Sequence, residues 1–421
     1  MNRTLYSALL YLISPLLLLY LAFRAIKSPD YRGRWAERFG LSRLQSTDLL
    51  IHSVSMGETL AAVPLINQVM DRYPQLSVTV TTTSPTGSAQ VKQAFGDRVQ
   101  HCYLPFDLPI CVARFLQQVQ PKVCIIMETE LWPNLLYQAK RRGCKLMLAN
   151  ARLSEKSAQQ YASRTQLSLP MLQALDVIAA QSSQAAERFI SLGVANHVVK
   201  VCGSLKFDLS VEQRHIDKAL SLRSEWQRQD APVWVAGSVH PGEFDIMLAA
   251  HKNLLIRFPD ALLVMVPRHP EQFENAAVHI KAAGLTLARR SQGDDVNGQT
   301  QVLLGDTMGE LLSFYGAADQ AFIGGTLIEN GGHNPLEPAA LGLPVYVGPH
   351  HWDFAEITQL LQASGGLSMV SSAQELALHL IEKWDDKAAY LAARQAGLKV
   401  VEDNKGALAK QFAVACQLIE Q

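Results

Sequence analysis

The sequence predicts an α/β fold in which two doubly wound domains with parallel sheets follow one N-terminal membrane helix. Three observations support this prediction. The chain has 421 residues, more than a single hydrophobic core usually organises, so two domains are expected. Short apolar runs alternate with helical stretches in two successive series, and the first residues form a long uncharged segment.

The N-terminal segment has the length of a membrane helix. Residues 4–23 carry no charge and are flanked by Arg3 and Arg24, and about 20 apolar residues match the hydrocarbon core of a bilayer. A cleaved signal peptide is the alternative, but the run is long for one and has no clear A-x-A cleavage site. Basic residues between Arg24 and Arg38 place the body on the cytoplasmic side by the positive-inside rule and can approach anionic headgroups. We therefore expect one uncleaved anchor over residues 1–24.

The first domain is expected over residues 25–206. Its apolar, strand-like runs cover residues 49–55, 77–83, 123–129, 145–150, 177–181 and 198–203, with helical stretches between them. Nearly continuous apolar strands that alternate with helices are typical of a parallel sheet covered on both faces.

The second domain is expected over residues 207–421. A polar, helical stretch up to Pro232 precedes a new series of strand-like runs at residues 233–237, 261–267, 302–306, 321–325, 344–348 and 367–370. The helical residues 387–421 end the chain and could pack back on the first domain. In such folds ligands bind beyond the carboxyl ends of the strands, so we expect the active site in a cleft between the domains.

Composition excludes some functions. The chain has 38 Lys and Arg against 38 Asp and Glu, with a pI of about 7.2, so no overall positive charge indicates nucleic-acid binding. The six cysteines are scattered without C-x-x-C spacing and are expected to be buried thiols in a reducing compartment.

Acidic and basic side chains follow several strands of the first domain. Glu58 stands three residues after Ser55, which fits a helix-capping box, but it also lies at a strand's carboxyl end, where a base for an incoming hydroxyl is needed. Glu128 and Glu130 follow a later strand, and either they cap the next helix or they face the cleft. Lys206 lies at the domain boundary and is either solvated or a cation of the site.

The second domain carries the features of a nucleotide site. A glycine-rich segment over residues 324–350 contains a helix start at Asn334 and Pro335, which favours bound anions. Arg268 suits a phosphate and follows a strand, although pairing with Glu271 is the structural alternative. His350 and His351 lack further ligands at metal-binding spacing, and the chain has no D-x-D motif, so we expect neither metal nor cofactor.

Together these features resemble bacterial 3-deoxy-D-manno-octulosonic acid (Kdo) transferases, which act in lipopolysaccharide biosynthesis and have the GT-B fold of two Rossmann-like domains. The matching motifs are SMGE, METELWPN, GSLKFD, PRHPE, GDTMGEL and GGHNPLEPAALGLPVYVGPH, at residues 55–58, 127–134, 203–208, 267–271, 305–311 and 331–350. The resemblance implies an inverting transfer of Kdo from CMP-Kdo to a lipid A disaccharide precursor of the lipid IVA type. It also implies an inner-membrane enzyme whose first domain binds the acceptor and whose second domain binds CMP-Kdo.

The resemblance also implies roles for individual residues. Glu58 matches the proton acceptor, whereas Glu128 and Lys206 match groups that assist the transition state. The donor-binding positions implied are Arg268, His269, Met308, Gly309, Glu310, Asn334, Pro335, Leu336 and Glu337. Two other functions stay open on the residues alone: a UDP-sugar-dependent transferase or epimerase of the same fold, and a membrane-tethered nucleotide-binding module without catalysis.

Overall fold

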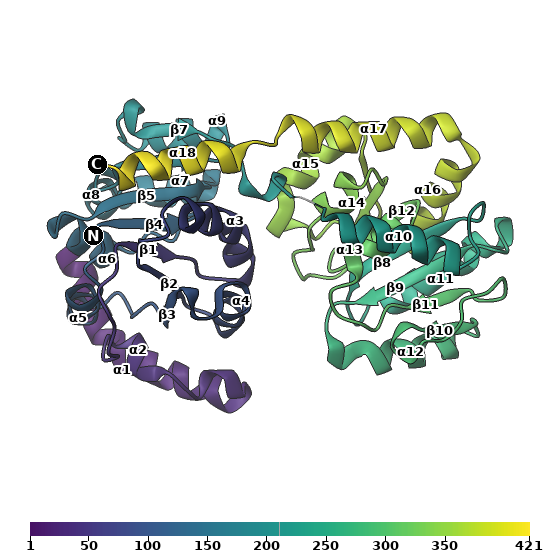
Figure 1. Cartoon of the computed structure of the whole chain (residues 1–421), viewed down its shortest axis with the longest axis horizontal. Helices are drawn as coiled ribbons and strands as arrows, with labels where there is room; N and C mark the ends of the chain where they lie inside the picture. Colours follow the sequence, from purple (N-terminus) through teal and green to yellow (C-terminus); the bar gives the residue numbers. More distant parts are fainter. Residues whose placement is uncertain (210) are drawn as a thin grey trace. The chain divides into compact units, whose positions relative to one another are not determined.

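The computed structural model describes residues 1–209 and 211–421, and they form two compact α/β units. The first unit comprises Met1–Asp208 and Lys405–Gln421, and the second comprises Leu209–Asn404. Figure 1 shows both units with most of their helices and strands labelled.

The first unit is built on a seven-stranded parallel sheet with the strand order β3-β2-β1-β4-β5-β6-β7. The strands are β1 (Leu49–His52), β2 (Val78–Thr82), β3 (Gln100–Tyr103), β4 (Val123–Met127), β5 (Lys145–Ala151), β6 (Val177–Ala180) and β7 (Val199–Val201). The helices are α1 (Arg3–Lys27), α2 (Trp35–Arg38), α3 (Met56–Arg72), α4 (Pro85–Phe95), α5 (Pro109–Val119), α6 (Pro133–Arg141), α7 (Glu155–Ala162), α8 (Thr165–Gln173), α9 (Ser183–Ser191) and α18 (Ala407–Ile419).

Helices cover both faces of this sheet because successive strand residues point in opposite directions. Leu49 and Ile51 of β1 pack in one core with α3, α4 and α18. Leu50, between them, packs in the opposite core with α5, α6, α8 and α9. The apolar strands predicted from the sequence are therefore buried on both sides.

The second unit repeats this architecture with the strand order β10-β11-β9-β8-β12-β13-β14, all neighbours being parallel. Its strands are β8 (Val233–Val239), β9 (Leu262–Pro267), β10 (Leu287–Arg289), β11 (Val302–Leu304), β12 (Gln320–Ile323), β13 (Val345–Val347) and β14 (Leu367–Met369). Its helices are α10 (Gln213–Glu225), α11 (Phe244–Arg257), α12 (Phe273–Ala282), α13 (Leu311–Gly316), α14 (Leu336–Ala340), α15 (Ala355–Ser364), α16 (Ala373–Asp385) and α17 (Lys387–Asp403).

The end of the chain differs from the predicted domain boundary. We placed residues 207–421 in the second domain and noted that the helical end could pack back on the first; α18 does pack on the first unit, where Val414, Ala415 and Leu418 join the core beside α3. The carboxylate of Asp208 accepts the N–H groups of Gly406 and Leu408 at 2.7 and 2.6 Å. Asp208 therefore ties the start of α18 to the point where the chain leaves the first unit.

Two strands were not predicted from the sequence. β3 and β10 each stand at the edge of a sheet and contain half-buried polar residues, so neither has the continuous apolar pattern of a central strand. The six cysteines form no disulfide, and all are buried except Cys416, which is half-buried.

Candidate functional site

Three of the predicted site residues gather in the first unit. Strands β1 and β4 are neighbours although the strands β2 and β3 lie between them in sequence, so the strand order reverses between them. Glu58 follows β1 and Glu128 follows β4. The carboxyl ends of two such strands form the usual binding crevice of a doubly wound sheet.

Glu58 is held by a capping box at the start of α3. The Ser55 Oγ accepts the Glu58 N–H at 3.2 Å and donates to Glu58 Oε1 at 2.9 Å. The Val54 N–H donates to Glu58 Oε2 at 2.8 Å. The capping interpretation of the sequence is therefore confirmed, and these bonds fix the carboxylate in one orientation.

The same carboxylate is nevertheless a stronger base than an ordinary glutamate. Burial raises the pKa of Glu58, and the charge of Glu128 raises it further, against the lowering effect of the capping bonds. The pKa of Glu130 rises to about 7 because of burial and the charges of Glu58 and Glu128. For Glu58, burial and the charge of Glu128 thus outweigh the helix start, which by itself would lower the pKa.

Lys206 lies beside this group of carboxylates. Its Nζ is 3.5 Å from Glu128 Oε1, and both side chains are largely shielded from solvent. The loop that carries Lys206 is fixed because Leu205 donates its N–H to Asn150 Oδ1 at 3.0 Å. Asn150 is buried, has a φ of 51°, and donates its own N–H to Gln411 of α18. Sequence reasoning missed this support because Gln411 is distant in the chain.

A buried carboxylate organises the second unit at the corresponding place, where β8 and β12 are neighbours. Glu243 accepts the N–H groups of Gly325, Thr326 and Leu327 at 2.7 to 3.1 Å, together with that of His240 at 3.0 Å. Burial raises the pKa of Glu243, while these four bonds oppose the rise. The side chain therefore shapes the turn after β12. Glu243 was not among the predicted site residues. Its position directly after the H-P-G turn that follows β8 is the feature of the sequence that could have indicated it.

Imidazole and guanidinium groups gather above this turn. The Nε2 atoms of His240 and His333 are 2.8 Å apart, Asn330 Nδ2 lies 3.1 Å from His240 Nε2, and the His240 and His269 rings are 5.5 Å apart. Burial and the nearby Arg268 charge lower the pKa of His333 to about 3. The His333 imidazole is therefore neutral near pH 7, and the Arg268 guanidinium supplies positive charge beside it. Among the described residues no ion pair joins Arg268 to Glu271, which was the structural alternative.

The predicted helix is formed, but it begins one residue later than expected: α14 starts at Leu336, and Pro335, not Asn334, is its N-cap. Asn334 Oδ1 accepts the Leu336 N–H at 3.1 Å, and Asn334 Nδ2 lies 3.5 Å from Glu337 Oε1. Burial raises the pKa of Glu337, while the Asn334 bond and the Arg268 charge lower it. The Arg268 guanidinium is therefore near enough to the Glu337 carboxylate for its charge to act on that carboxylate. Pro335 and Leu336 are buried, so they can meet a ligand only at its margin.

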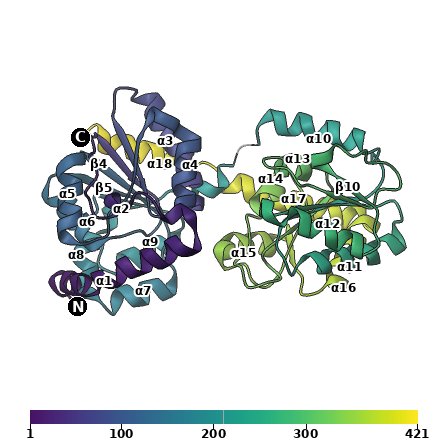
Figure 2. The same cartoon turned by 90° about the horizontal axis from the view of Figure 1, so that it is seen from below.

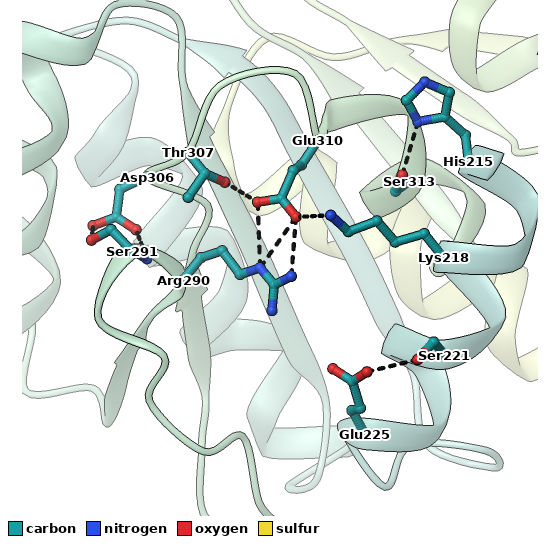
Figure 3. Close-up of polar contacts among 10 residues, drawn as sticks. All are labelled: His215, Lys218, Ser221, Glu225, Arg290, Ser291, Asp306, Thr307, Glu310 and Ser313. Atoms are coloured by element: carbon teal, nitrogen blue, oxygen red, sulfur yellow. Dashed lines mark hydrogen bonds and ion pairs between the residues drawn. The ribbon is translucent and has the colours of Figure 1, made fainter. Parts of the chain in front are cut away.

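Glu310 is engaged in a different group of side chains, shown in Figure 3. Lys218 and Arg290 form ion pairs with it, and Thr307 donates a hydrogen bond to it. Burial raises the pKa of Glu310, but these bonds outweigh burial and bring the pKa to about 2. The preceding Met308 is 65% exposed and Gly309 has a φ of 80°, so the backbone here is open to a ligand.

A cavity of about 680 Å³ in the first unit lies away from the predicted residues. Lys122, Arg142 and Lys145 line it near the beginnings of β4 and β5. Glu128 follows the carboxyl end of β4. Because β4 and β5 are parallel, Glu128 lies at the end of these strands opposite to the cavity. Within residues 1–209 and 211–421, no group of three or more histidine, cysteine or carboxylate side chains could hold a metal ion.

Comparisons with known proteins agree on one family. A family model described as 3-deoxy-D-manno-octulosonic-acid transferase (kdotransferase) matches residues 33–209. The 3-deoxy-D-manno-octulosonic acid transferase of Haemophilus influenzae is 43% identical over 413 residues, which cover 97% of this chain and 96% of that protein. The transferase of the same name from Bordetella pertussis is 35% identical over 387 residues and covers 87% of each chain.

A solved structure with low identity supports the fold. The UDP-GlcNAc 2-epimerase of Neisseria meningitidis, bound to UDP-GlcNAc, has a TM-score of 0.57 at 12% identity and covers 88% of this chain and 99% of that one. The predicted fold of two Rossmann-like units of the GT-B type is thereby confirmed. From the identity and coverage of the transferases, the chain belongs to the family of 3-deoxy-D-manno-octulosonic acid transferases, which are glycosyltransferases.

Proposed function

We propose that this transferase moves Kdo from CMP-Kdo to a lipid A disaccharide precursor of the lipid IVA type, with inversion at the anomeric carbon. The first unit binds the acceptor and supplies the base, and the second unit binds the donor. The observation that carries the proposal is Glu58, a capped, half-buried carboxylate with a raised pKa at the reversal point of the first sheet.

Glu58 accepts the proton of the acceptor hydroxyl in this mechanism. The hydroxyl oxygen forms a bond to the anomeric carbon of Kdo while the bond from that carbon to the phosphate oxygen of CMP breaks. One such displacement inverts the carbon, as in single-step glycoside chemistry. The capping bonds leave the carboxylate fixed in place, and its raised pKa brings it nearer the range that favours proton acceptance.

Lys206 and Glu128 stabilise the charges that develop. The transition state resembles an oxocarbenium ion, and the donor sugar is itself an acid. Lys206 offers a cation to the sugar carboxylate, and Glu128 holds that cation through the 3.5 Å ion pair. Glu128 also bears negative charge beside the forming cation.

The second unit holds the leaving nucleotide. The guanidinium group of Arg268 fits the single phosphate of CMP, and His269 stands next to it. Glu337, whose charge interacts with Arg268, binds the ribose hydroxyls, and Met308, Gly309 and Glu310 contact the nucleoside. Because Arg268 carries a permanent charge, CMP requires no metal ion or cofactor in this scheme.

Helix α1, whose residues 4–23 carry no charge, attaches the enzyme to the cytoplasmic face of the bacterial inner membrane. It contains one candidate membrane span, Arg3–Ile26. The apolar window of this span has a mean hydropathy of 2.0, and only 6% of the window is buried inside the protein. An acceptor with acyl chains resides in the membrane, so attachment brings the enzyme to its substrate.

Product analysis with the purified full chain tests this function. Labelled CMP-Kdo and a detergent-dispersed lipid A precursor should give a product whose mass rises by one or more Kdo units. A UDP-sugar enzyme would instead consume a UDP-sugar and leave CMP-Kdo intact when both are offered. A binding module without catalysis would bind CMP and release no labelled product.

A further inference from the structure

We infer that α1 lies flat against the first unit and in the plane of the membrane surface, so that one face contacts lipid and the helix does not cross the bilayer. This inference rests on the membrane attachment proposed above. Positions of reduced exposure recur along the whole helix at alternating steps of four and three residues: Arg3, Ser7, Leu10, Ser14, Leu17, Leu21 and Arg24. Such a stripe defines one face of the helix, and its two buried members, Ser7 and Leu21, lie near the two ends of the helix.

The beginning of α1 is fixed by a buried polar network. Ser7 Oγ donates to Asn134 Oδ1 at 3.0 Å, and an Arg3 guanidinium nitrogen donates to the same oxygen at 3.2 Å. Tyr6 hydrogen-bonds to the carboxylate of Asp107, which in turn accepts the Asn134 N–H at 2.9 Å. Ser7, Asn134 and Asp107 are all buried. The first turns of α1 are thus part of the first unit, beside α5 and α6 (Figures 1 and 2).

The end of α1 is attached to the same unit. Leu21 is 1% exposed, and the Arg24 guanidinium donates to the Tyr31 hydroxyl at 2.8 Å and lies over its ring. Tyr31 is held because its carbonyl accepts the Trp35 Nε1–H at 2.6 Å. Arg38, three residues further, is buried and donates to the carbonyl of Thr83 after β2. A continuous chain of contacts therefore links the last turn of α1 to the sheet.

The opposite face of α1 is apolar and exposed. Its large side chains, all between 43% and 75% exposed, include Leu5, Leu9, Leu12, Leu16, Leu19 and Phe23. The surface continues onto α5 and α6, where Ile110 and Tyr137 are 46% and 38% exposed and contact Tyr11 and Arg3. Contiguous apolar surface of this kind marks a contact site. The exposed Arg32, whose Nε donates to the Ala25 carbonyl, places positive charge beside it, which suits anionic lipid headgroups.

The geometry excludes a span while these contacts hold. A helix of 25 residues is about 37 Å long, at about 1.5 Å per residue, and the hydrocarbon core is about 30 Å thick. A spanning α1 would hold its two ends on opposite sides of the bilayer. Both ends are bonded to one polar unit, which cannot enter hydrocarbon. An in-plane helix keeps every contact and buries its apolar face in the lipid, as interfacial helices do.

Cysteine labelling in sealed membrane vesicles tests the orientation. Both variants are made in the full chain with Cys416→Ser. The test variant carries Asn2→Cys, just before α1. The control carries Asp295→Cys, at an exposed site of the second unit. A membrane-impermeant maleimide should label both positions from the same face and to a similar extent. Labelling of residue 2 from the face opposite to residue 295, or from neither face, would overturn the inference.

Depth measurements on the same helix provide an independent readout. Nitroxides at residues 5, 12, 19 and 23 should report similar depths in vesicles containing about 30% anionic lipid, because these positions share the lipid face. A steady progression of depth from one leaflet to the other would instead show a span. Kdo transfer is assayed separately, so an inactive protein with the expected labelling would contradict the proposed function and leave the orientation of α1 supported.

Discussion

Glu58 and Glu375 occupy the same position in two capping boxes, yet their pKa values shift in opposite directions. Each N–H donates at 3.2 Å to a serine hydroxyl three residues earlier, and each Oε2 accepts the N–H of the residue four positions earlier. The Ser371 bonds lower the pKa of Glu375. Burial and Glu128 raise that of Glu58. The environment, not the helix start, therefore makes Glu58 a candidate base.

Glu58→Gln is expected to abolish transfer without unfolding the protein. The amide oxygen can still accept the Val54 N–H, but the side chain can no longer accept a proton. Loss of a general base typically lowers the rate by about 100- to 10,000-fold. Initial rates with CMP-Kdo and dispersed acceptor measure the effect, and Glu375→Gln is the matched control that changes a capping box alone. A Glu58→Gln enzyme with more than about a third of wild-type activity would reduce Glu58 to a helix cap.

The pH dependence of transfer should reflect the ionisation of the interacting glutamates of the first unit. Glu58 must be ionised to accept a proton, so its raised pKa should place the acidic limb of kcat/KM above the ordinary value of 4.5. Because Glu58, Glu128 and Glu130 interact, the limb belongs to the group as a whole. Glu128→Gln removes a neighbouring negative charge, so the limb should move to lower pH.

The control for this pH shift is Glu155→Gln, which removes an exposed charge at the start of α7. It should leave the limb in place. A limb that moves to higher pH in Glu128→Gln, or that stays unchanged, would contradict the electrostatic coupling between Glu128 and Glu58.

Donor binding should depend on Arg268 and Glu337. Charged hydrogen bonds contribute roughly 1.5 to 3 kcal/mol, so Arg268→Ala and Glu337→Ala should each weaken CMP binding by about 10- to 150-fold. Affinity for the lipid acceptor should change little. Calorimetry with CMP measures the effect, and Arg257→Ala, which removes an exposed arginine of the same unit, is the control. CMP affinity equal to wild type in both variants would place the donor site elsewhere.

Glu243 should protect the turn after β12 from hydrogen exchange. Glu243→Ala removes the acceptor of three consecutive N–H groups and leaves these buried donors without a partner. The amides of Gly325, Thr326 and Leu327 should then exchange at least about tenfold faster, which corresponds to about 1.4 kcal/mol. CMP affinity should fall as the turn loosens.

Mass spectrometry of the peptide around residues 320–330 measures this exchange. Glu271→Ala, an exposed glutamate of the same unit, is the control and should leave the peptide protected. Unchanged exchange in Glu243→Ala would show that the glycine-rich backbone holds the turn without the carboxylate.

Much of the fold followed from local sequence patterns. The central strands, such as β4 and β9, are continuous apolar runs because both of their faces are buried, and a run of this kind is visible without any tertiary information. The edge strands β3 and β10 were missed because an edge strand has polar, half-buried positions. The sequence also left the placement of α18 open, because the Asp208 bonds and the core beside α3 that hold it join residues far apart in the chain.

The sequence by itself determined the type of chemistry: which acidic and basic side chains follow which strands, and a series of motifs similar to those of Kdo transferases. Only the tertiary structure showed that Glu58 and Glu128 follow neighbouring strands, that Glu243 organises the turn after β12, and that both ends of α1 are bonded to one unit. The reason is physical. Strand patterns and helix caps depend on residues close in sequence, whereas burial, charge coupling and long-range hydrogen bonds depend on residues that meet only after the chain has folded.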